Sequence, residues 1–160
     1  MVKFIWLSLA ALVVDQASKL IVASWMDLGE SVQVLGDFLQ ITYVHNPGAA
    51  FGLRLGGRIF HSIFSVAAML FVVVLFWRVP ADDRGGRISL TLIFGGALGN
   101  ILDRIRLGEV VDFLDVGAGD LRWPVFNLAD AFVTVGVILL IFLYLYRKEG
   151  RKPALVRRND

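Results

Sequence analysis

The stretch from residue 59 to residue 79 reads IFHSIFSVAAMLFVVVLFWRV, and its only ionisable side chains, His61 and Arg78, lie near its ends. A helix that crosses a membrane needs about 20 consecutive residues that are mostly apolar. The stretch therefore predicts a transmembrane helix, and the rest of the sequence is interpreted as that of a membrane protein.

The composition of the chain supports this interpretation. Its 160 residues are 57% hydrophobic and 19% charged, with a mean hydropathy of +0.70. Soluble domains are about 45–50% apolar and about 25% charged. The length fits one domain and leaves no room for a separate soluble catalytic module. Because the sequence has no cysteine, disulfide scaffolds, thiol nucleophiles, iron–sulfur clusters and cysteine zinc sites are excluded.

Three further apolar stretches complete a set of four predicted spans, at residues 4–26, 59–79, 88–104 and 125–146. We predict an all-α membrane protein, a four-transmembrane-helix bundle formed by one integral membrane domain over residues 1–147. The first span has an alternative interpretation as a cleaved signal peptide, because Lys3 precedes an apolar run of suitable length. Apolar residues resume at Leu20, which favours a retained helix.

The distribution of Lys and Arg predicts that both termini are cytoplasmic, because cytoplasmic segments of membrane proteins are enriched in positive charge. Ten of the sixteen Lys and Arg residues then lie inside and five outside, with Lys19 within the first span. The ten are Lys3, Arg78, Arg84, Arg87, Arg147, Lys148, Arg151, Lys152, Arg157 and Arg158. Residues 148–160 form a basic cytoplasmic tail in this arrangement. The four tryptophans fall near span ends, as an interfacial aromatic belt requires: Trp6, Trp25, Trp77 and Trp123.

Two segments, residues 27–58 and 105–124, then face outward. Ser31–Leu35 and Phe38–Val44 are rich in strand-forming residues and are separated by a glycine-containing turn. We predict a small extracytoplasmic β-sheet at the membrane surface. The small residues that follow, over 45–52, predict a turn whose backbone another chain can approach closely.

Asp112 and Asp130 are the strongest candidates for catalysis. Both are expected near the outer interface, where an ionisable group is costly and a functional role is the default hypothesis. Two carboxyl groups brought close together share a proton, so that one activates a water molecule and the other acts as an acid. The alternatives are a solvated loop acid for Asp112 and, for Asp130, an acid stabilised by a helix N-terminus.

Other polar residues lie in or near the predicted spans. Asn100 ends a glycine-rich stretch that permits close helix packing and hydrogen bonds between helices. Arg104 is suited to bidentate binding of a carboxylate or a phospholipid head group, or to a plain interfacial anchor. Asp15 and Lys19 are four residues apart and can pair on one helix face, either within a polar site or as a neutralised structural pair.

Asn46 and Asn127 flank the candidate carboxylates in the predicted arrangement, and Asn127 is equally suited to cap the fourth helix. His45 and His61 are isolated in the sequence, and no H-E-x-x-H spacing occurs. We therefore expect no metal ion at the site.

In their order along the chain, these motifs resemble those of bacterial lipoprotein signal peptidase, also called signal peptidase II or prolipoprotein signal peptidase. The matching stretches are DQASK at 15–19, NPGAAF at 46–51, GGALGN at 95–100 with Asp103 and Arg104, VVDF at 110–113 and FNLAD at 126–130. Each motif alone is weak, but five in this order are highly specific. The resemblance covers nearly the whole chain up to Arg147.

The resemblance implies an intramembrane aspartic endopeptidase of the bacterial cytoplasmic (inner) membrane, with its active site near the outer face. Such an enzyme removes the signal peptide from a diacylglyceryl-modified prolipoprotein, cleaving just before the lipidated cysteine. The implied catalytic dyad is Asp112 and Asp130. The implied substrate-binding or dyad-supporting residues are Asn46, Asn100, Arg104, Asn127, Asp15 and Lys19. The resemblance also implies contact with membrane phospholipid, inhibition by globomycin-type cyclic peptides, and no cofactor.

The residues alone are also compatible with two other functions. A small ion or proton transporter would use Asp15, Lys19, Asp112 and Asp130 as a path, although the acids after residue 100 cluster toward one side of the membrane. A non-catalytic lipid-binding or assembly subunit would depend on the glycine-rich stretch. We expect no nucleic-acid partner.

Overall fold

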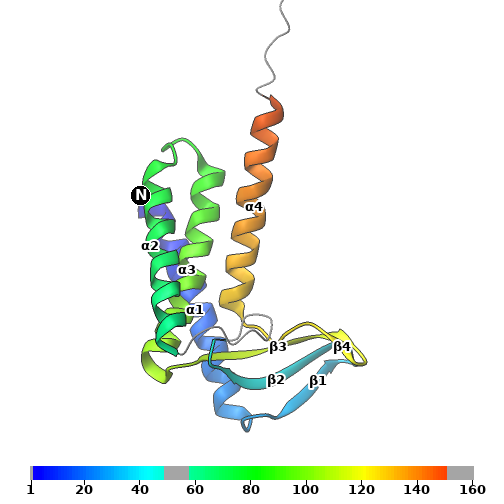
Figure 1. Ribbon diagram of the computed structural model, residues 1–160. Coiled ribbons are helices and arrows are strands. Elements are labelled where there is room, and N and C mark those ends of the chain that lie inside the picture. The colour runs from blue at the N-terminus through cyan, green and yellow to red at the C-terminus, as the bar shows by residue number, and fades with distance from the viewer. Residues whose placement is uncertain (1, 49–57, 151–160) are drawn as a thin grey trace, which may run out of the picture.

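The computed structural model describes residues 2–48 and 58–150, which form four helices and four strands (Figure 1). The helices are α1 (Val2–Trp25), α2 (Arg58–Arg78), α3 (Arg84–Leu107) and α4 (Leu128–Gly150). The strands are β1 (Ser31–Leu35), β2 (Leu39–Asn46), β3 (Val110–Ala118) and β4 (Leu121–Arg122). The predicted turn over 45–52 lies partly outside the described residues, and the predicted tail over 148–160 lies mostly outside them.

All four helices are long and apolar enough to cross a membrane, as the sequence predicts. The bounds of the last two differ from the predicted spans of 88–104 and 125–146. Helix α3 begins at Arg84 because the carboxylate of Asp83 caps it, accepting the N–H of Gly86 at 2.8 Å. It ends beyond residue 104, at Leu107, and is capped by Gly108, whose φ of 75° is left-handed. Hydropathy does not register such polar helix ends, so α3 extends beyond the apolar stretch from which the span was predicted.

Helix α3 is the central element of the bundle and contacts each of the other three helices. Its glycines permit this close packing. A methyl group at Gly95 would lie 2.9 Å from the carbonyl oxygen of Ser8 in α1. From the opposite side, a methyl group at Gly136 of α4 would lie 2.7 Å from the carbonyl oxygen of Ser89. Small residues thus bring α1 and α4 against α3, as expected where lipid supplies no hydrophobic driving force between helices.

The four strands form one antiparallel sheet in the order β1-β2-β3-β4, and it lies across one end of the bundle (Figure 1). The first predicted strand is confirmed at Ser31–Leu35, and the second is found at Leu39–Asn46. Strand β3 was not predicted from the sequence, because its mostly apolar residues lack the alternation of a half-exposed strand. Its first four residues are all buried, which explains the missing alternation.

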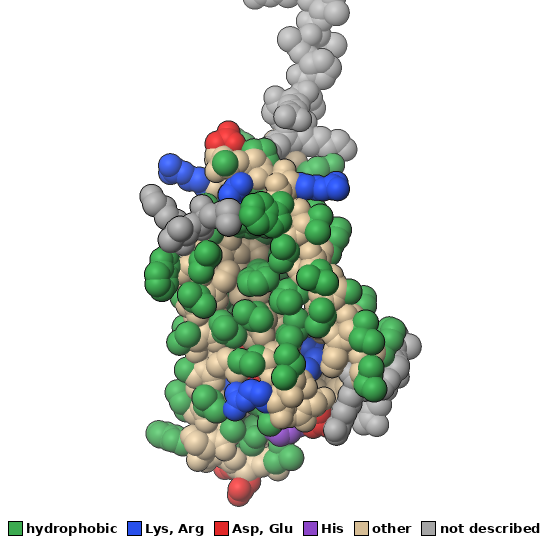
Figure 2. All heavy atoms as spheres, turned by 90° about the vertical axis from the view of Figure 1, so that its left-hand side faces the viewer, with side chains coloured by type: hydrophobic (Ala, Val, Ile, Leu, Met, Phe, Trp, Pro, Cys, Tyr) green, Lys and Arg blue, Asp and Glu red, His purple; other side chains and the backbone are tan. Residues whose placement is uncertain are grey.

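The surface of the helical part is largely apolar. Hydrophobic side chains cover most of the face that α1 and α2 present, and charged side chains lie mainly toward the two ends of the molecule (Figure 2). Helix α2 is the most exposed of the four, with large apolar side chains such as Ile63, Phe64 and Phe71 each more than 60% exposed. Such a surface is suited to contact with lipid chains rather than water.

Candidate active site

The two candidate carboxylates lie at the junction of the bundle and the sheet. Asp112 is the third residue of β3 and is 1% exposed. Asp130 lies in the first turn of α4, close to the end of that helix nearest the sheet (Figure 1). Both line a single cleft with a volume of about 770 Å³. The fold therefore brings together two acids that lie 18 residues apart in the chain.

Asn127 connects the two acids directly. Its side-chain oxygen accepts the backbone N–H of Asp130 at 2.9 Å, which caps the N-terminus of α4. Its side-chain nitrogen donates to Oδ1 of Asp112 at 2.6 Å. The two roles considered for Asn127 in the sequence, helix cap and neighbour of the acids, are thus filled by opposite ends of one amide.

Asn46 holds the other oxygen of Asp112. It is the last residue of β2, and its Nδ2 donates to Oδ2 of Asp112 at 2.9 Å. Its own side-chain oxygen accepts the backbone N–H of Gly48 at 2.9 Å. Both oxygens of Asp112 therefore accept a hydrogen bond from an asparagine amide.

Asn100 and Arg104 reach the site from α3. Nδ2 of Asn100 donates to Oδ1 of Asp130 at 2.7 Å, and its Oδ1 accepts Nδ2 of Asn127 at 3.1 Å. Arg104 lines the cleft and donates from its guanidinium group to the carbonyl oxygen of Asn100 at 3.2 Å. A positive charge therefore lies beside the two acids, on the wall formed by α3.

Asp15 and Lys19 form the ion pair that their spacing predicts, with Nζ of Lys19 at 2.9 Å from Oδ2 of Asp15. Neither lines the cleft. Asp103, which the sequence placed next to Arg104 without a role of its own, pairs with the same ammonium at 2.7 Å. Oδ1 of Asp15 accepts the backbone N–H of Ala129 at 2.9 Å and so ties α1 to the first turn of α4.

The surroundings of Asp112 favour its neutral form. Burial raises the pKa of Asp112 from 3.8 to about 7, and the nearby charge of Asp130 acts in the same direction. Hydrogen bonds from Asn46 and Asn127, and the charge of Lys19, oppose this rise. A carboxyl group in this state is able both to donate and to accept a proton near neutral pH.

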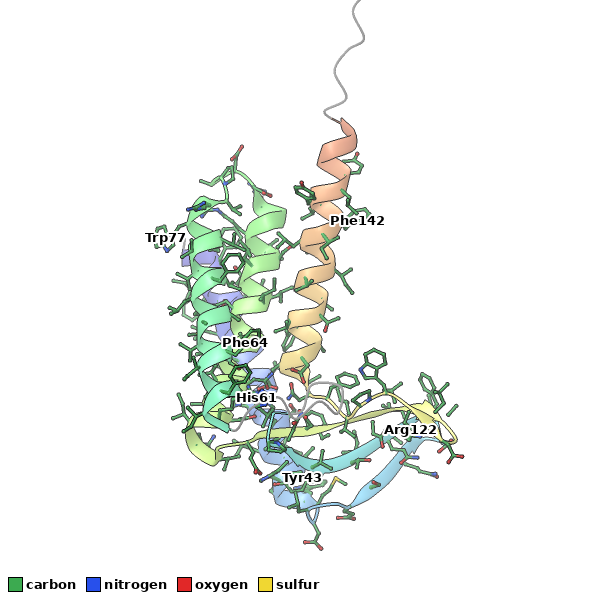
Figure 3. All side chains as sticks on the ribbon, in the orientation of Figure 1. Tyr43, His61, Phe64, Trp77, Arg122 and Phe142 are labelled. Atoms are coloured by element: carbon green, nitrogen blue, oxygen red, sulfur yellow. The ribbon has the colours of Figure 1, made fainter. Side chains whose placement is uncertain are left out.

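Most residues of the cleft walls come from α2 and α4, Arg104 contributes from α3, and β2, β3 and residues 123–126 lie on the sheet side. Figure 3 shows His61 and Phe64 on the part of α2 nearest the sheet. His61 lines the cleft and packs so closely on Gly48 that a methyl group there would overlap its ring. These wall residues, and Thr134 on α4, were not predicted from the sequence, because nothing in an apolar helix marks which face borders a cleft.

His45 is not isolated, contrary to the interpretation of the sequence. Its Nε2 lies 3.0 Å from the hydroxyl of Tyr43, and its Nδ1 lies 3.5 Å from a carboxylate oxygen of Glu109. Within the described residues no group of three or more His, Cys, Asp or Glu side chains is arranged to hold a metal ion. The polar groups around the two acids include Arg104 and the amides of Asn46, Asn100 and Asn127, and His61 also lines the cleft.

Comparison with known proteins gives a consistent result. A family model described as Signal peptidase (SPase) II matches residues 7–146. The chain is 42% identical to the lipoprotein signal peptidase of Moorella thermoacetica, over 94% of this chain and 99% of that protein. It is 44% identical to the lipoprotein signal peptidase of Geobacter sulfurreducens, over 90% of this chain and 91% of that protein.

Two solved structures, each described as a bacterial membrane enzyme, have a similar fold. The first is 34% identical in sequence with a TM-score of 0.84, covering 98% of this chain and 96% of the other. The second is 36% identical with a TM-score of 0.79, covering 91% and 94%. The similarity therefore extends over both the helical bundle and the sheet.

Proposed function

Because this multi-pass membrane protein belongs to the signal peptidase II family, we propose that it removes the signal peptide from diacylglyceryl-modified prolipoproteins, cleaving just before the lipidated cysteine. The proposed enzyme is an intramembrane aspartic endopeptidase with Asp112 and Asp130 as its catalytic dyad. One observation supports the assignment of this dyad: the two acids, from β3 and α4, line one cleft and are joined through Asn127.

In the proposed reaction, the ionised carboxyl group of the dyad takes a proton from a water molecule, whose oxygen attacks the carbonyl carbon of the scissile amide. The protonated carboxyl group donates its proton to the carbonyl oxygen, which gives a gem-diol intermediate. When the C–N bond breaks, a proton passes from the dyad to the leaving nitrogen and the gem-diol returns its own proton. The pKa of Asp112 at about 7 supports such an exchange of roles.

The supporting residues have distinct parts in this proposal. Asn46 and Asn127 hold both oxygens of Asp112, and Asn100 holds Oδ1 of Asp130. Such preorganised donors fix the direction of each carboxyl group before the substrate arrives. Arg104 is suited to bind a substrate carbonyl or a phosphate group at the cleft wall.

The substrate's signal peptide is proposed to lie in the cleft between α2 and α4. The walls there are mostly apolar, with Phe64 on α2 and Ala131 and Val135 on α4. The diacylglyceryl chains of the substrate would remain among the membrane phospholipids, and the sheet would cover the scissile bond. Globomycin-type cyclic peptides are proposed to inhibit the enzyme by occupying the same cleft.

We further propose that the protein lies in the cytoplasmic membrane of a bacterium, with one integral domain over 1–147, both termini in the cytoplasm and the cleft near the outer face. The excess of Lys and Arg on the side of the termini supports this orientation. The transporter interpretation is not supported. Asp15, Lys19, Asp112 and Asp130 belong to one connected network beside the first turn of α4 and are not spread along the bundle.

The test uses the purified chain in lipid vesicles with a diacylglyceryl-modified prolipoprotein. Asp112→Asn and Asp130→Asn are each expected to fold and to lower kcat by about 10²- to 10⁴-fold, because each removes one proton-transfer group. The matched control is Asp115→Asn, which alters another buried acid of β3 whose partners are Thr42 and Arg122. Full activity in either dyad variant would disprove the mechanism, as would equal loss in the control.

A further inference from the structure

A buried ammonium group lies beside the proposed dyad without touching it. Lys19 is 3% exposed, and its Nζ contacts carboxylate oxygens of Asp15 at 2.9 Å and Asp103 at 2.7 Å. It also donates to Oδ1 of Asn100 at 3.1 Å. A lysine has three N–H donors and no acceptor, so these three partners account for all of its hydrogen bonds.

The bond from Lys19 to Asn100 is not needed to neutralise the charge. Asp15 and Asp103 already supply two negative charges for one positive charge, and both are at most 3% exposed. A buried charge is tolerated when it is paired and fully hydrogen-bonded. The cluster therefore holds the ammonium group at a fixed point, from which its third donor is directed at Asn100.

This direction determines how the amide of Asn100 is turned, because an amide has an acceptor at one end and two donors at the other. An ammonium group only donates, so Oδ1 of Asn100 must face Lys19. Nδ2 is then directed at Oδ1 of Asp130, where it lies at 2.7 Å. In the inverted amide, the NH₂ group would face the ammonium of Lys19 and the side-chain oxygen would face the carboxylate of Asp130.

Asn127 reinforces the same orientation from the other side. Its own amide is fixed because its oxygen accepts the backbone N–H of Asp130. Its Nδ2 therefore points toward Asn100 and donates to Oδ1 at 3.1 Å. Two donors thus converge on the oxygen of Asn100, and Lys19 is the one that carries a charge.

On the basis of the proposed function, we infer that Lys19 is a positioning residue for Asp130 and acts through the amide of Asn100. It touches neither acid of the dyad and does not line the cleft. Its removal lets the amide invert, which replaces a donor to Asp130 with an acceptor. The family resemblance implies that Lys19 supports the substrate or the dyad, and the route through Asn100 specifies which carboxyl group Lys19 positions and how.

The test measures kcat, KM and thermal stability of Lys19→Met with the same lipidated substrate. We expect kcat to fall about 10- to 100-fold, as for other displacements of a reacting group by a change outside the reacting centre. KM is expected to stay unchanged because no residue of the cleft wall is altered. Because the charge of Lys19 also acts on the pKa of Asp112, each kcat is taken at that variant's own pH optimum. In an Asn100→Leu background, Lys19→Met is then expected to cause no further loss of kcat, because the route through Asn100 is already absent.

The matched control is Gln16→Met, which perturbs the same buried cluster. Nε2 of Gln16 donates to Asp103 at 2.9 Å and to Asp15 at 3.2 Å, but Gln16 makes no hydrogen bond to Asn100 within the described residues. Its melting temperature is expected to fall while kcat is retained. If loss of kcat simply followed loss of stability, the two variants would behave alike, and the positioning role would be wrong.

Lys19→Met leaves two buried carboxylates unpaired and risks misfolding. The double variant Lys19→Met/Asp103→Asn removes one charge of each sign, and its kcat is expected to fall as well. Wild-type kcat in a folded variant of either kind, or losses that multiply between Lys19→Met and Asn100→Leu, would overturn the positioning role alone. An inactive wild-type enzyme would overturn the proposed function and with it this inference.

Discussion

At the scale of single residues, asparagine side chains determine the geometry around Asp112 and Asp130. An asparagine amide donates at one end and accepts at the other, so a cap or turn formed by its oxygen fixes where its nitrogen points. The side-chain oxygen of Asn46 accepts the N–H of Gly48, and that of Asn127 accepts the N–H of Asp130. Local backbone structure thus sets the direction of both donors to Asp112.

The pH dependence of activity belongs to this scale. The proposed dyad needs one protonated carboxyl group, and the pKa of Asp112 is about 7. We therefore expect kcat/KM to decline as pH rises above about 7, where that proton is lost. Initial rates of cleavage between pH 5 and pH 9, in buffers of constant ionic strength, measure this.

The raised pKa of Asp112 also makes the free energy of unfolding depend on pH. Between 3.8 and about 7 the folded chain holds a proton on Asp112 that the unfolded chain has released. The contribution of this group to the free energy of unfolding therefore decreases as pH rises through that window and is level above it. Asp112→Asn should remove this contribution from the melting curves. An unchanged pH dependence of melting in that variant would contradict the assignment.

At the scale of the elements, β3 and the start of α4 position the two acids. Strand β3 pairs with β2, and Val44 lies opposite Asp112 in the register. Phe126, just before α4, is bridged to Leu114 of the same strand. The chain therefore enters α4 beside β3, which places the first turn of that helix next to Asp112.

The packing of α3 against α4 offers a test of this arrangement. In Gly136→Leu, the first added carbon would lie 2.7 Å from the carbonyl oxygen of Ser89 and from Cγ1 of Ile93. Because backbone cannot move aside easily, we expect a destabilisation of about 1–3 kcal/mol and a lower melting temperature. The control is Ile138→Leu, whose side chain is 62% exposed on the surface of α4. Equal melting temperatures for the two variants would contradict this packing.

At the scale of the whole molecule, the sheet covers one end of the helical bundle and the four proposed spans run toward the other (Figure 1). The side of the membrane on which the sheet lies decides whether the cleft is open to the outer or the inner compartment. The Lys and Arg distribution predicts the outer side for the sheet.

Because the chain has no cysteine, single-cysteine variants can test this orientation. Asp120→Cys lies in the exposed turn between β3 and β4, and Ala81→Cys lies in the exposed loop between α2 and α3. In intact spheroplasts, a membrane-impermeant maleimide should label the first and label the second only after lysis. The reverse pattern would place the cleft on the cytoplasmic side.

The sequence by itself determined the elements that depend on local composition. Four apolar stretches of sufficient length gave four helices, and β-rich residues gave β1 and β2 close to their observed positions. The pairing of Asp15 with Lys19 also followed from local spacing, because residues four apart share one helix face.

Only the tertiary structure decided which distant groups meet. Asp15 bonds the N–H of Ala129 across 114 positions of the chain, and Asp103 joins Lys19 across 84. Strand β3 is likewise recognised only from its pairing with β2 and β4, because its buried residues show no alternation of apolar and polar side chains. The physical reason is that apolar length and helix spacing are properties of a short segment, whereas a hydrogen-bond partner is fixed only when separate segments pack together.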